Sequence, residues 1–327
     1  MKRSVGIVLV TFLAFATVGA GTAAATFPGA DGNLVFWIDE RSPSEIVSID
    51  PNGTNRTVLV SSARRNYATP AWSADGEKIA YVSQGSGPDR LMTMNADGTN
   101  RTVLMNSRRR PLLNGISWSP DGTQIAASAF IASQHQFQIV VVNVDSSGFS
   151  VITTTGDNYE PDWSPDGTRI VFERWGQLQG IRTIDPNGTD PTPVIHLAVA
   201  PSWSPDGSLI AFTRPNTGFE DDELYVIAPN GTGFAQLTDS PNRFELAPAF
   251  SPDGTRIAFS RTVANDIYAP NDIWVMDVDG TDAVRVTDTP KVDELGPSWQ
   301  PILAGRIGEL AAAPHDRRAD PRLTTHG

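Results

Sequence analysis

The sequence predicts an all-β protein, a six-bladed β-propeller of four-stranded antiparallel blades. Three observations support this prediction: a recurring pentapeptide Trp-Ser-Pro-Asp-Gly, a short apolar run after each copy, and a Gly-Thr turn further on. The Asp-Gly pairs of the pentapeptide follow one another at steps of 40 to 47 residues and end at Gly32, Gly76, Gly122, Gly167, Gly207 and Gly254. A period of this length is typical of solenoids, propellers and other repeat arrays.

Residues 1–25 are predicted to form a secretory signal peptide. Lys2 and Arg3 precede an apolar run from Val5 to Val18, and small residues follow up to Ala25. The run is too short to cross a bilayer comfortably, and the small residues are typical of a cleavage site. We therefore expect an exported protein, periplasmic or extracellular, without a stable membrane span after cleavage.

Composition narrows the possible partners. The chain contains no Cys, which excludes disulfides and a lipid-bearing N-terminal cysteine. The formal net charge is −12. The electrostatic field of a protein with this excess of negative charge repels nucleic acid and anionic lipid. The acidic residues are spread through predicted loops, a pattern that favours solubility. We expect no nucleic-acid partner.

Two apolar runs follow each Asp-Gly pair, and both predict strands because of their length and residue types. The first runs are residues 34–36, 79–81, 125–127, 170–172, 210–212 and 257–259. The second runs are residues 45–49, 91–94, 138–142, 181–184, 224–227 and 273–276. Almost no helical periodicity is present, so the predicted propeller domain, residues 26–302, contains only strands.

Glycine-containing turns connect these strands. Five of the six turns after the second run read Asn-Gly-Thr or Asp-Gly-Thr, and the sixth is Ser146-Ser147-Gly148. Asn-Gly and Asp-Gly provide the positive φ of tight hairpins, so each turn leads into a third antiparallel strand. The strand with Trp or Phe leads into the next Ser-Pro-Asp-Gly turn. We call the Trp strand A and the following strands B, C and D.

The two chain ends are predicted to complete one blade together. No Trp strand precedes Asp31, whereas residues 297–300 have the strand A pattern without a strand B after them. If this C-terminal strand joins the first blade, the ring closes with six blades and hides its sheet edges. We expect a monomer. Residues 303–327 break the repeat pattern and are predicted to be a disordered tail.

The motif P-x-W-S-P-D-G-x-x-I-A-F, followed by I-x-V-x-x-x-D-G-T and by a terminal pair such as Leu237-Thr238, resembles the WD40-like PD40 repeats of TolB-type propellers. The resemblance covers residues 27–301 and implies a six-bladed propeller. TolB itself is a periplasmic partner of the Tol-Pal envelope system and carries an α/β domain before its propeller. This chain departs from that pattern, because its repeats begin directly after the predicted signal.

The loops predict which end of the disc binds a ligand. The A–B and C–D hairpins lie at one end and are nearly invariant between repeats, whereas the B–C and D–A connections lie at the other end and vary. Recognition usually uses variable loops on a regular scaffold. The candidate ligand-binding residues in these connections are Arg65, Tyr67, Arg109, Tyr159, Glu160, His196, Arg243 and Glu245.

We expect no cofactor. The acidic run from Glu220 to Glu223 could hold Ca²⁺ through carboxylate oxygens, but it does not have the ligand spacing of a calcium loop, and we interpret it as a solvated loop. Four histidines, two of them in the predicted tail, do not predict a histidine metal site. The recurrent tryptophans are expected to pack between blades, and the aspartates of the Asp-Gly turns to stabilise those turns.

Two functions are compatible with the sequence. The first is a non-enzymatic binding module or scaffold that engages a protein or another cell-envelope component through the variable loops. The alternative is a Ca²⁺-dependent propeller hydrolase or lyase, similar to lactonases or esterases, with its site at the axial mouth. That site would need Asn66, Asn158, Glu160 and Glu245 to converge. We assign no catalytic residue, since the nucleophile motif G-x-S-x-G is missing.

Overall fold

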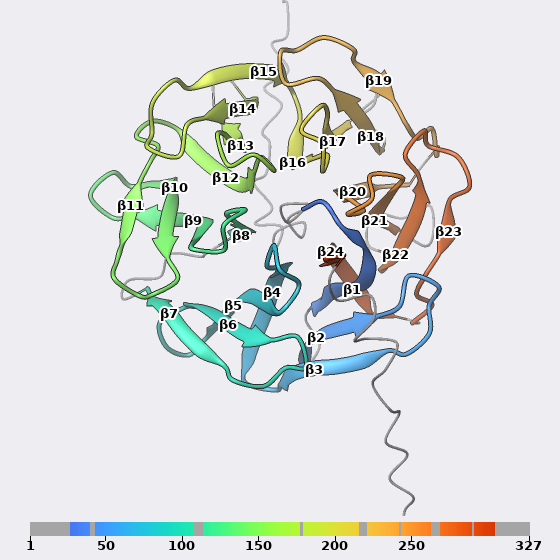
Figure 1. The fold of residues 1–327 in the computed structure, drawn as a ribbon, viewed down its shortest axis with the longest axis horizontal. Coiled ribbons are helices and arrows are strands. Elements are labelled where there is room, and N and C mark those ends of the chain that lie inside the picture. The colour runs from blue at the N-terminus through green and yellow to red at the C-terminus, as the bar shows by residue number, and fades with distance from the viewer. Residues whose placement is uncertain are drawn as a thin grey trace, which may run out of the picture.

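The described residues form 24 strands arranged in six four-stranded antiparallel sheets around a central axis (Figure 1). The computed structural model describes residues 27–39, 43–107, 114–176, 179–215, 221–241, 243–262, 269–289 and 291–304. The predicted signal peptide and almost all of the predicted tail lie outside these ranges. Within them, no helix has the length and apolar character needed to cross a membrane. The predicted six-bladed propeller is confirmed.

Each blade contains one strand of each type, in the order A to D. Blade 1 consists of β24 (Asp293–Ile302), β1 (Ala30–Asp39), β2 (Ser44–Ile49) and β3 (Thr57–Ser62). Blade 2 consists of β4 (Arg65–Trp72), β5 (Lys78–Gly85), β6 (Arg90–Asn95) and β7 (Thr102–Asn106). Blade 3 consists of β8 (Asn114–Trp118), β9 (Gln124–Ile131), β10 (Gln136–Asn143) and β11 (Phe149–Val151).

The second half repeats this order. Blade 4 consists of β12 (Asp157–Trp163), β13 (Ile170–Trp175), β14 (Gly180–Ile184) and β15 (Thr192–His196). Blade 5 consists of β16 (Val199–Trp203), β17 (Ile210–Pro215), β18 (Asp222–Ile227) and β19 (Ala235–Gln236). Blade 6 consists of β20 (Glu245–Phe250), β21 (Arg256–Thr262), β22 (Asn271–Asp277) and β23 (Val284–Arg285).

The C-terminal strand closes the ring as predicted. Strand β24 pairs antiparallel with β1, and Trp299 lies opposite Leu34. Gln300 stands where the other repeats have Ser. Its Oε1 accepts a hydrogen bond from the Asn33 N–H at 3.4 Å, and its Nε2 donates to the Gly76 carbonyl of blade 2 at 2.9 Å. The turn that is continuous in other blades is therefore assembled from both ends of the chain.

The core lies between neighbouring blades. The aromatic residue that ends strand A is at most 4% exposed in every blade: Trp72, Trp118, Trp163, Trp203, Phe250 and Trp299. Trp72 of blade 2, for example, belongs to one buried cluster with Val35 and Leu59 of blade 1. The prediction that these aromatic residues pack between blades is confirmed.

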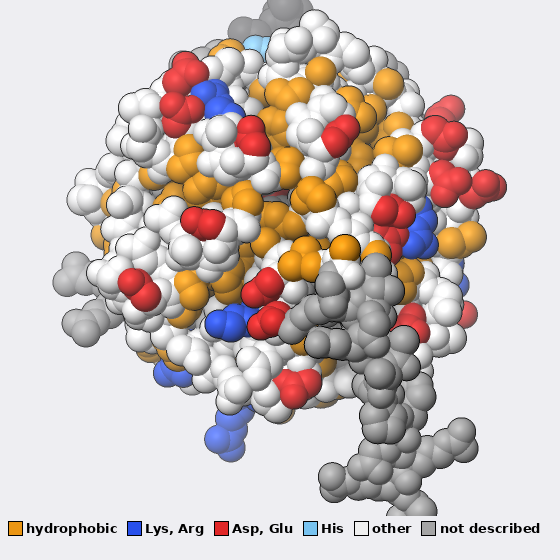
Figure 2. Space-filling model, viewed as in Figure 1, with side chains coloured by type: hydrophobic (Ala, Val, Ile, Leu, Met, Phe, Trp, Pro, Cys, Tyr) orange, Lys and Arg blue, Asp and Glu red, His pale blue; other side chains and the backbone are white. Residues whose placement is uncertain are grey.

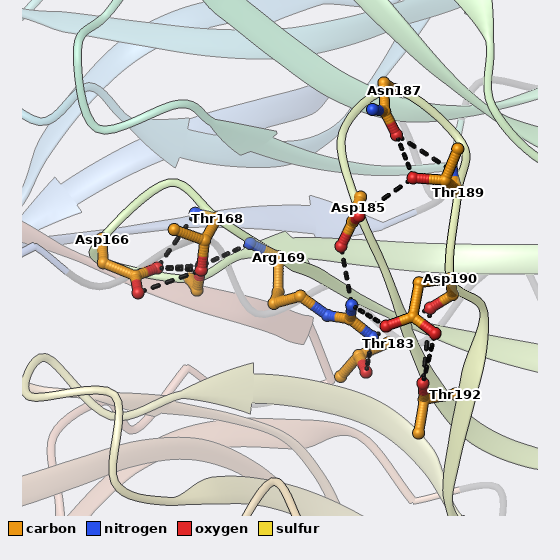
Figure 3. A network of polar contacts seen from close by, with 10 residues as sticks. Asp166, Thr168, Arg169, Thr183, Asp185, Asn187, Thr189, Asp190 and Thr192 are labelled. Atoms are coloured by element: carbon orange, nitrogen blue, oxygen red, sulfur yellow. Dashed lines mark hydrogen bonds and ion pairs between the residues drawn. The ribbon is translucent and has the colours of Figure 1, made fainter.

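The A–B and C–D hairpins, which we call the regular end, are held by short local hydrogen bonds. In blade 3 the Ser119 hydroxyl donates to Asp121 Oδ1 at 2.6 Å, and this bond holds the pKa of the Asp121 carboxyl below its ordinary value. In blade 4, Arg169 donates to Asp185 at 2.6 Å and to Asp190 at 2.8 Å (Figure 3). The predicted turn-stabilising role is confirmed for five of the six aspartates, since each accepts a hydrogen bond from the backbone N–H two residues later: Asp75, Asp121, Asp166, Asp206 and Asp253. The prediction is wrong for Asp31, which instead accepts from Arg256 and from the Asp253 N–H of blade 6.

Each strand A also contains a β-bulge that the sequence did not predict. The residue three positions before the terminal aromatic has a φ between 50° and 68° in all six blades: Thr69, Gly115, Glu160, Ala200, Ala247 and Gly296. In three blades the backbone N–H of this residue donates to a strand B side chain: Glu160 to Ser128, Ala200 to Glu173 and Gly296 to Ser260. In each case the acceptor belongs to the preceding blade, so these bulges connect neighbouring blades near the axis.

Candidate functional site

The B–C and D–A connections form the opposite end of the disc, which we call the variable end. Among the candidate residues, Arg65 and Tyr67 begin β4, Tyr159 and Glu160 lie near the start of β12, and the other described candidates are His196, Arg243 and Glu245. These seven residues lie at the variable end, whereas Arg109 is outside the described residues. The regular end faces the viewer in Figure 2, where apolar side chains gather around the centre and acidic ones are spread around the ring.

Two candidate arginines are anchored to their own blades. The Arg65 guanidinium donates to the Ser83 hydroxyl and to the Ser83 carbonyl, both at 2.6 Å. Arg243 donates to the Thr262 carbonyl at 3.2 Å. Each acceptor lies near the end of strand B, and both arginines are partly exposed. Their positive charges are therefore presented from fixed positions, which lowers the entropy lost when a partner binds.

Four aromatic side chains form a cluster across blades 3 and 4, which we call the aromatic patch. The ring centroids are separated by 5.4 Å between Phe130 and Phe137, 5.0 Å between Phe137 and Tyr159, and 6.2 Å between Tyr159 and Trp175. Trp175 is 47% exposed. Only Tyr159 was a candidate from the sequence. Trp175 could have been found, because it is a tryptophan outside the repeated Trp position and directly before a B–C loop.

Glu160 and Glu173 form a pair of carboxyl groups beside this patch. The two side chains are hydrogen-bonded to each other, and Glu173 Oε2 also accepts from the Ala200 N–H of blade 5 at 3.3 Å. Although part of Glu160 is exposed, its carboxyl group is enclosed. Burial raises the pKa of Glu160 well above its ordinary value and raises the pKa of Glu173 to about 8. At neutral pH the pair therefore holds a proton.

Glu245 lies inside the molecule rather than on its rim. It is fully buried and pairs with Arg261, whose Nε donates to Glu245 Oε1 at 2.6 Å. Glu223 of blade 5 is hydrogen-bonded to Glu245 of blade 6 and accepts from the Thr238 hydroxyl at 2.6 Å. This threonine belongs to the terminal Leu-Thr pair of the repeat. The motif therefore supplies part of a buried polar contact between blades 5 and 6.

The interpretation of the acidic run as a solvated loop is wrong for the residues that the structure describes. Asp221 is 4% and Glu223 1% exposed, and Asp222 is partly buried. The reason is that strand β18 begins at Asp222, so Glu223 points into a blade contact instead of into a loop. Burial and the charge of Asp221 raise the pKa of Asp222 to about 6.

The residues of the alternative calcium site bind different partners. The Asn158 amide donates to Gln138 Oε1 at 2.9 Å and its carbonyl oxygen accepts from Arg174 at 3.1 Å. Glu160 pairs with Glu173, and Glu245 pairs with Arg261 in another blade. Throughout the described ranges, no group of three or more His, Asp or Glu side chains is placed to hold a metal ion.

The remaining candidates lie on the surface. His196 ends strand β15 and is exposed, and Tyr67 is partly exposed with its ring 5.8 Å from that of Tyr81. The variable end thus offers two chemical features near one another in blade 4: an aromatic contact surface and a carboxyl pair that can release or take up a proton.

One protein family matches this chain. The model of PD40, described as a TolB beta propeller domain, matches residues 29–195. No curated protein sequence matches the chain. Among solved structures, TolB from Acinetobacter baumannii is 22% identical, with a TM-score of 0.69, covering 84% of this chain and 68% of that one.

Two further structures share the fold. A putative TolB from Agrobacterium tumefaciens is 19% identical, with a TM-score of 0.64 and coverage of 83% of this chain and 99% of that one. An oligogalacturonate lyase in complex with manganese is 17% identical, with a TM-score of 0.57 and coverage of 81% of this chain and 77% of that one. Identities this low show a common fold, and one propeller fold hosts different functions.

Proposed function

Because this chain belongs to the family of TolB β-propeller domains, we propose that it is an exported, monomeric binding protein. Its variable end would engage another protein, and it would act as a scaffold in the cell envelope or outside the cell rather than as an enzyme. Export is inferred from the sequence between Lys2 and Ala25, which has the order of charged, apolar and small residues of a signal peptide.

The aromatic patch is the observation that carries this proposal. Tyr and Trp are enriched in protein interfaces, because a rigid ring buries much apolar area at a low cost in side-chain entropy. Trp175 is 47% exposed, whereas the tryptophans that end strand A are almost completely buried. A partner that covers Trp175 would bury apolar surface that is now in contact with water.

The scaffold supports this use. Every blade holds its neighbour through a buried aromatic residue, so the loops of the variable end are presented from a closed ring. Arg65 and Arg243 are held by backbone and hydroxyl contacts, and their remaining donor groups can bind carboxylates of a partner. The patch would thus supply most of the affinity, and the arginines would orient the partner.

Site-specific photo-crosslinking tests the proposal. A photoreactive phenylalanine analogue is placed at Trp175 in one variant, and at Thr123 in the regular end in a control variant. After irradiation in the native cell-envelope fraction, we expect a discrete crosslinked protein only with the first variant. Excess unlabelled propeller should compete for this product, whereas excess Trp175→Ala propeller should compete at least tenfold less well. Equal crosslinking from both ends would contradict the proposal.

A hydrolase or lyase is a second candidate, and the Glu160–Glu173 pair is the observation that favours it. A carboxyl group that keeps its proton near neutral pH can act as a general acid, and it can act as a base after it has given up that proton. The experiment is an activity screen on esters, lactones and uronic-acid oligosaccharides, with and without Ca²⁺ or Mn²⁺. Turnover that is lost in Glu160→Gln would support this candidate, and no turnover with any substrate class would eliminate it.

A further inference from the structure

Three strands of blade 4 bring basic side chains to one face near the variable end. Strands β13, β14 and β15 lie side by side (Figure 1). Arg174 of β13 lies opposite Gly180 of β14, and Gly180 lies opposite His196 of β15. Arg182 follows Gly180 by two residues and therefore shares its face. Because directly paired residues of antiparallel strands also share a face, Arg174, Arg182 and His196 surround Gly180, which has no side chain.

The spacing of strands in a sheet places these three side chains within reach of one ligand. Neighbouring strands are about 4.8 Å apart, so the backbones of Arg174 and His196 are separated by about 10 Å. Arg182 is the diagonal neighbour of both residues, at about 7–8 Å, a distance that long side chains can span. A group bound above Gly180 would therefore lie between the three basic side chains.

None of the three basic side chains has an acidic partner among the residues that the structure describes. No ion pair in this part of the chain includes Arg174, Arg182 or His196. The Arg182 Nε is enclosed and has no hydrogen-bond acceptor there. Arg174 donates from Nε to Asn158 Oδ1 at 3.1 Å and from Nη2 to the Thr155 carbonyl at 2.5 Å, and both acceptors are neutral. These contacts fix the guanidinium of Arg174 but leave its charge without compensation.

Arg169 in the same blade shows how an arginine is neutralised within this chain. It forms ion pairs with Asp185 at 2.6 Å and with Asp190 at 2.8 Å (Figure 3). Arg174 and Arg182, by contrast, lie diagonally across one face as two like charges, which repel each other. Burial, and then the charge of Arg182, lower the pKa of Arg174. In a chain with a formal net charge of −12, two neighbouring arginines without a carboxylate favour an anion that comes from outside the chain.

A hydroxyl group adds a neutral donor beside the arginines. Thr155 Oγ1 accepts a hydrogen bond from Arg174 Nη2 at 3.0 Å, so its own hydrogen is directed to another acceptor. Thr155 and His196 are exposed, and Arg174 and Arg182 are partly exposed, so a ligand can approach from solvent. Guanidinium groups bind the oxygens of carboxylates and phosphates through charge-assisted hydrogen bonds.

We propose that Arg174, Arg182 and His196 form a binding site for an oxyanion, a carboxylate or a phosphate group, which lies above Gly180. The two arginines supply the positive charge, and His196 supplies a further N–H donor. The site is separate from the aromatic patch, because Arg174 and Trp175 are consecutive in β13 and their side chains lie on opposite faces. The proposal therefore does not depend on the proposed function.

Nuclear magnetic resonance titrations with inorganic phosphate and, separately, with acetate test the site at pH 7 and constant ionic strength. We expect saturable shifts of the Arg182 Nε–Hε signal and of the Gly180 amide signal, with a Kd on the order of 1 mM. Saturation by phosphate but not by acetate would assign the site to a phosphate group, and the reverse would assign it to a carboxylate. Shifts that do not saturate with either anion would overturn the proposal.

Two variants with the same substitution locate the binding. In Arg182→Gln the affinity, read from the Gly180 amide, should fall about tenfold or more, because a charged donor is lost. The unfolding midpoint measured without anion should be unchanged or higher, since repulsion from Arg174 is removed. The control is Arg169→Gln, which removes an arginine that Asp185 already neutralises and should keep the affinity within about twofold.

A third variant tests the site at a position outside the core. His196 is exposed, so His196→Ala should keep the fold and weaken anion binding about threefold. Far-ultraviolet circular dichroism checks that each variant is folded. An unchanged affinity in both Arg182→Gln and His196→Ala would overturn the proposal, and so would a loss in Arg169→Gln as large as that in Arg182→Gln.

Discussion

Arg261 shows how a single charged residue is accommodated inside the ring. It is 11% exposed, its guanidinium carbon lies 4.7 Å from the ring centroid of Trp274 and 5.3 Å from that of Phe259, and it pairs with the fully buried Glu245. Removing one member of a buried ion pair leaves the other charge without compensation in a medium of low polarity. Removing Arg261 should therefore destabilise the fold mainly because the Glu245 carboxylate would stay buried without a compensating charge.

We predict that Arg261→Ala lowers the free energy of unfolding by about 3–5 kcal/mol. The control is Arg169→Ala in the partly exposed network of Figure 3, where ion pairs contribute about 1 kcal/mol or less each. Urea denaturation at pH 7 measures both. Equal losses in the two variants would show that Glu245 is not left as an uncompensated charge. The double variant Arg261→Met with Glu245→Leu should recover much of the loss, because it removes both charges.

The buried carboxyl group of Glu223 leads to a separate prediction, about how the free energy of unfolding depends on pH. Burial, and then the charge of Glu245, raise the pKa of Glu223 to about 7, above its ordinary value of 4.5. The folded state then binds more protons than the unfolded state, so the free energy of unfolding falls as the pH rises from about 4.5 to about 7 and becomes constant above. The loss is on the order of 1–3 kcal/mol.

The measurement for Glu223 is urea denaturation at several pH values between 4.5 and 8. Glu223→Gln should reduce the slope in this window, while Glu45→Gln in blade 1 should leave it unchanged. A slope that does not differ between Glu223→Gln and the unmodified protein would show that this carboxyl group titrates normally in the folded state.

At the scale of the strands and hairpins, glycine has two roles that the sequence does not separate. Gly98 in a C–D turn has a φ of 81°, and a Cβ there would lie 2.5 Å from the Leu59 carbonyl oxygen of the preceding blade. Gly122 in an A–B turn has a φ of 69°, with open space around the position of a Cβ. Gly122 is needed only for its backbone angle, whereas Gly98 also permits the close approach of two blades.

These two glycines provide a matched pair of variants. Gly122→Ala is expected to cost about 1–2 kcal/mol for its left-handed conformation. Gly98→Ala should cost about 1–3 kcal/mol more than Gly122→Ala, because the alanine methyl group would push the hairpin away from Leu59. Thermal and urea denaturation of both variants check this order. If Gly98→Ala were no worse than Gly122→Ala, the hairpin would have moved without cost, and close packing of the outer strands would not contribute to stability.

For the whole molecule, closure through β24 decides stability. This strand supplies Trp299 to the contact of blades 6 and 1, and it hydrogen-bonds with the full length of β1. A second link crosses the same contact. Arg256 of blade 6 forms an ion pair with Asp31, with 2.5 Å between Nη2 and Oδ2, and its guanidinium carbon lies 5.0 Å from the centroid of the Trp299 ring. Without β24, strand β1 would expose an unpaired edge with buried apolar residues behind it.

We predict that truncation after Thr289, which removes β24, abolishes cooperative unfolding, whereas truncation after Ala304 leaves the unfolding midpoint unchanged. Because an exposed sheet edge favours aggregation of the first variant, Trp299→Ala provides a milder test, with an expected loss of about 3–5 kcal/mol. A synthetic peptide of residues 290–304 added to the first variant should restore the cooperative transition. Cooperative unfolding of the first variant without the peptide would show that an open array is stable.

The parts of the fold that follow from local residue patterns could be predicted. The six blades, the order of their strands and the closing strand depend on a repeat whose turns are determined by neighbouring residues such as Ser119 and Asp121. The bulges could not be predicted in this way, because their positions hold Thr, Gly, Glu and Ala, which share no propensity for a positive φ. In blades 4, 5 and 1 the bulge instead accompanies a hydrogen bond to the preceding blade, a contact that only the closed ring provides.

The candidate site was predicted less completely, and for the same reason. The sequence by itself determined which loops vary and therefore which end of the disc carries Arg65, Tyr159 and Arg243. Only the tertiary structure decided that Trp175 and Phe137 meet Tyr159, and that Glu245 is enclosed with Arg261. Turns depend on residues adjacent in the chain, whereas burial and pairing of side chains depend on how neighbouring blades face each other once the ring has closed.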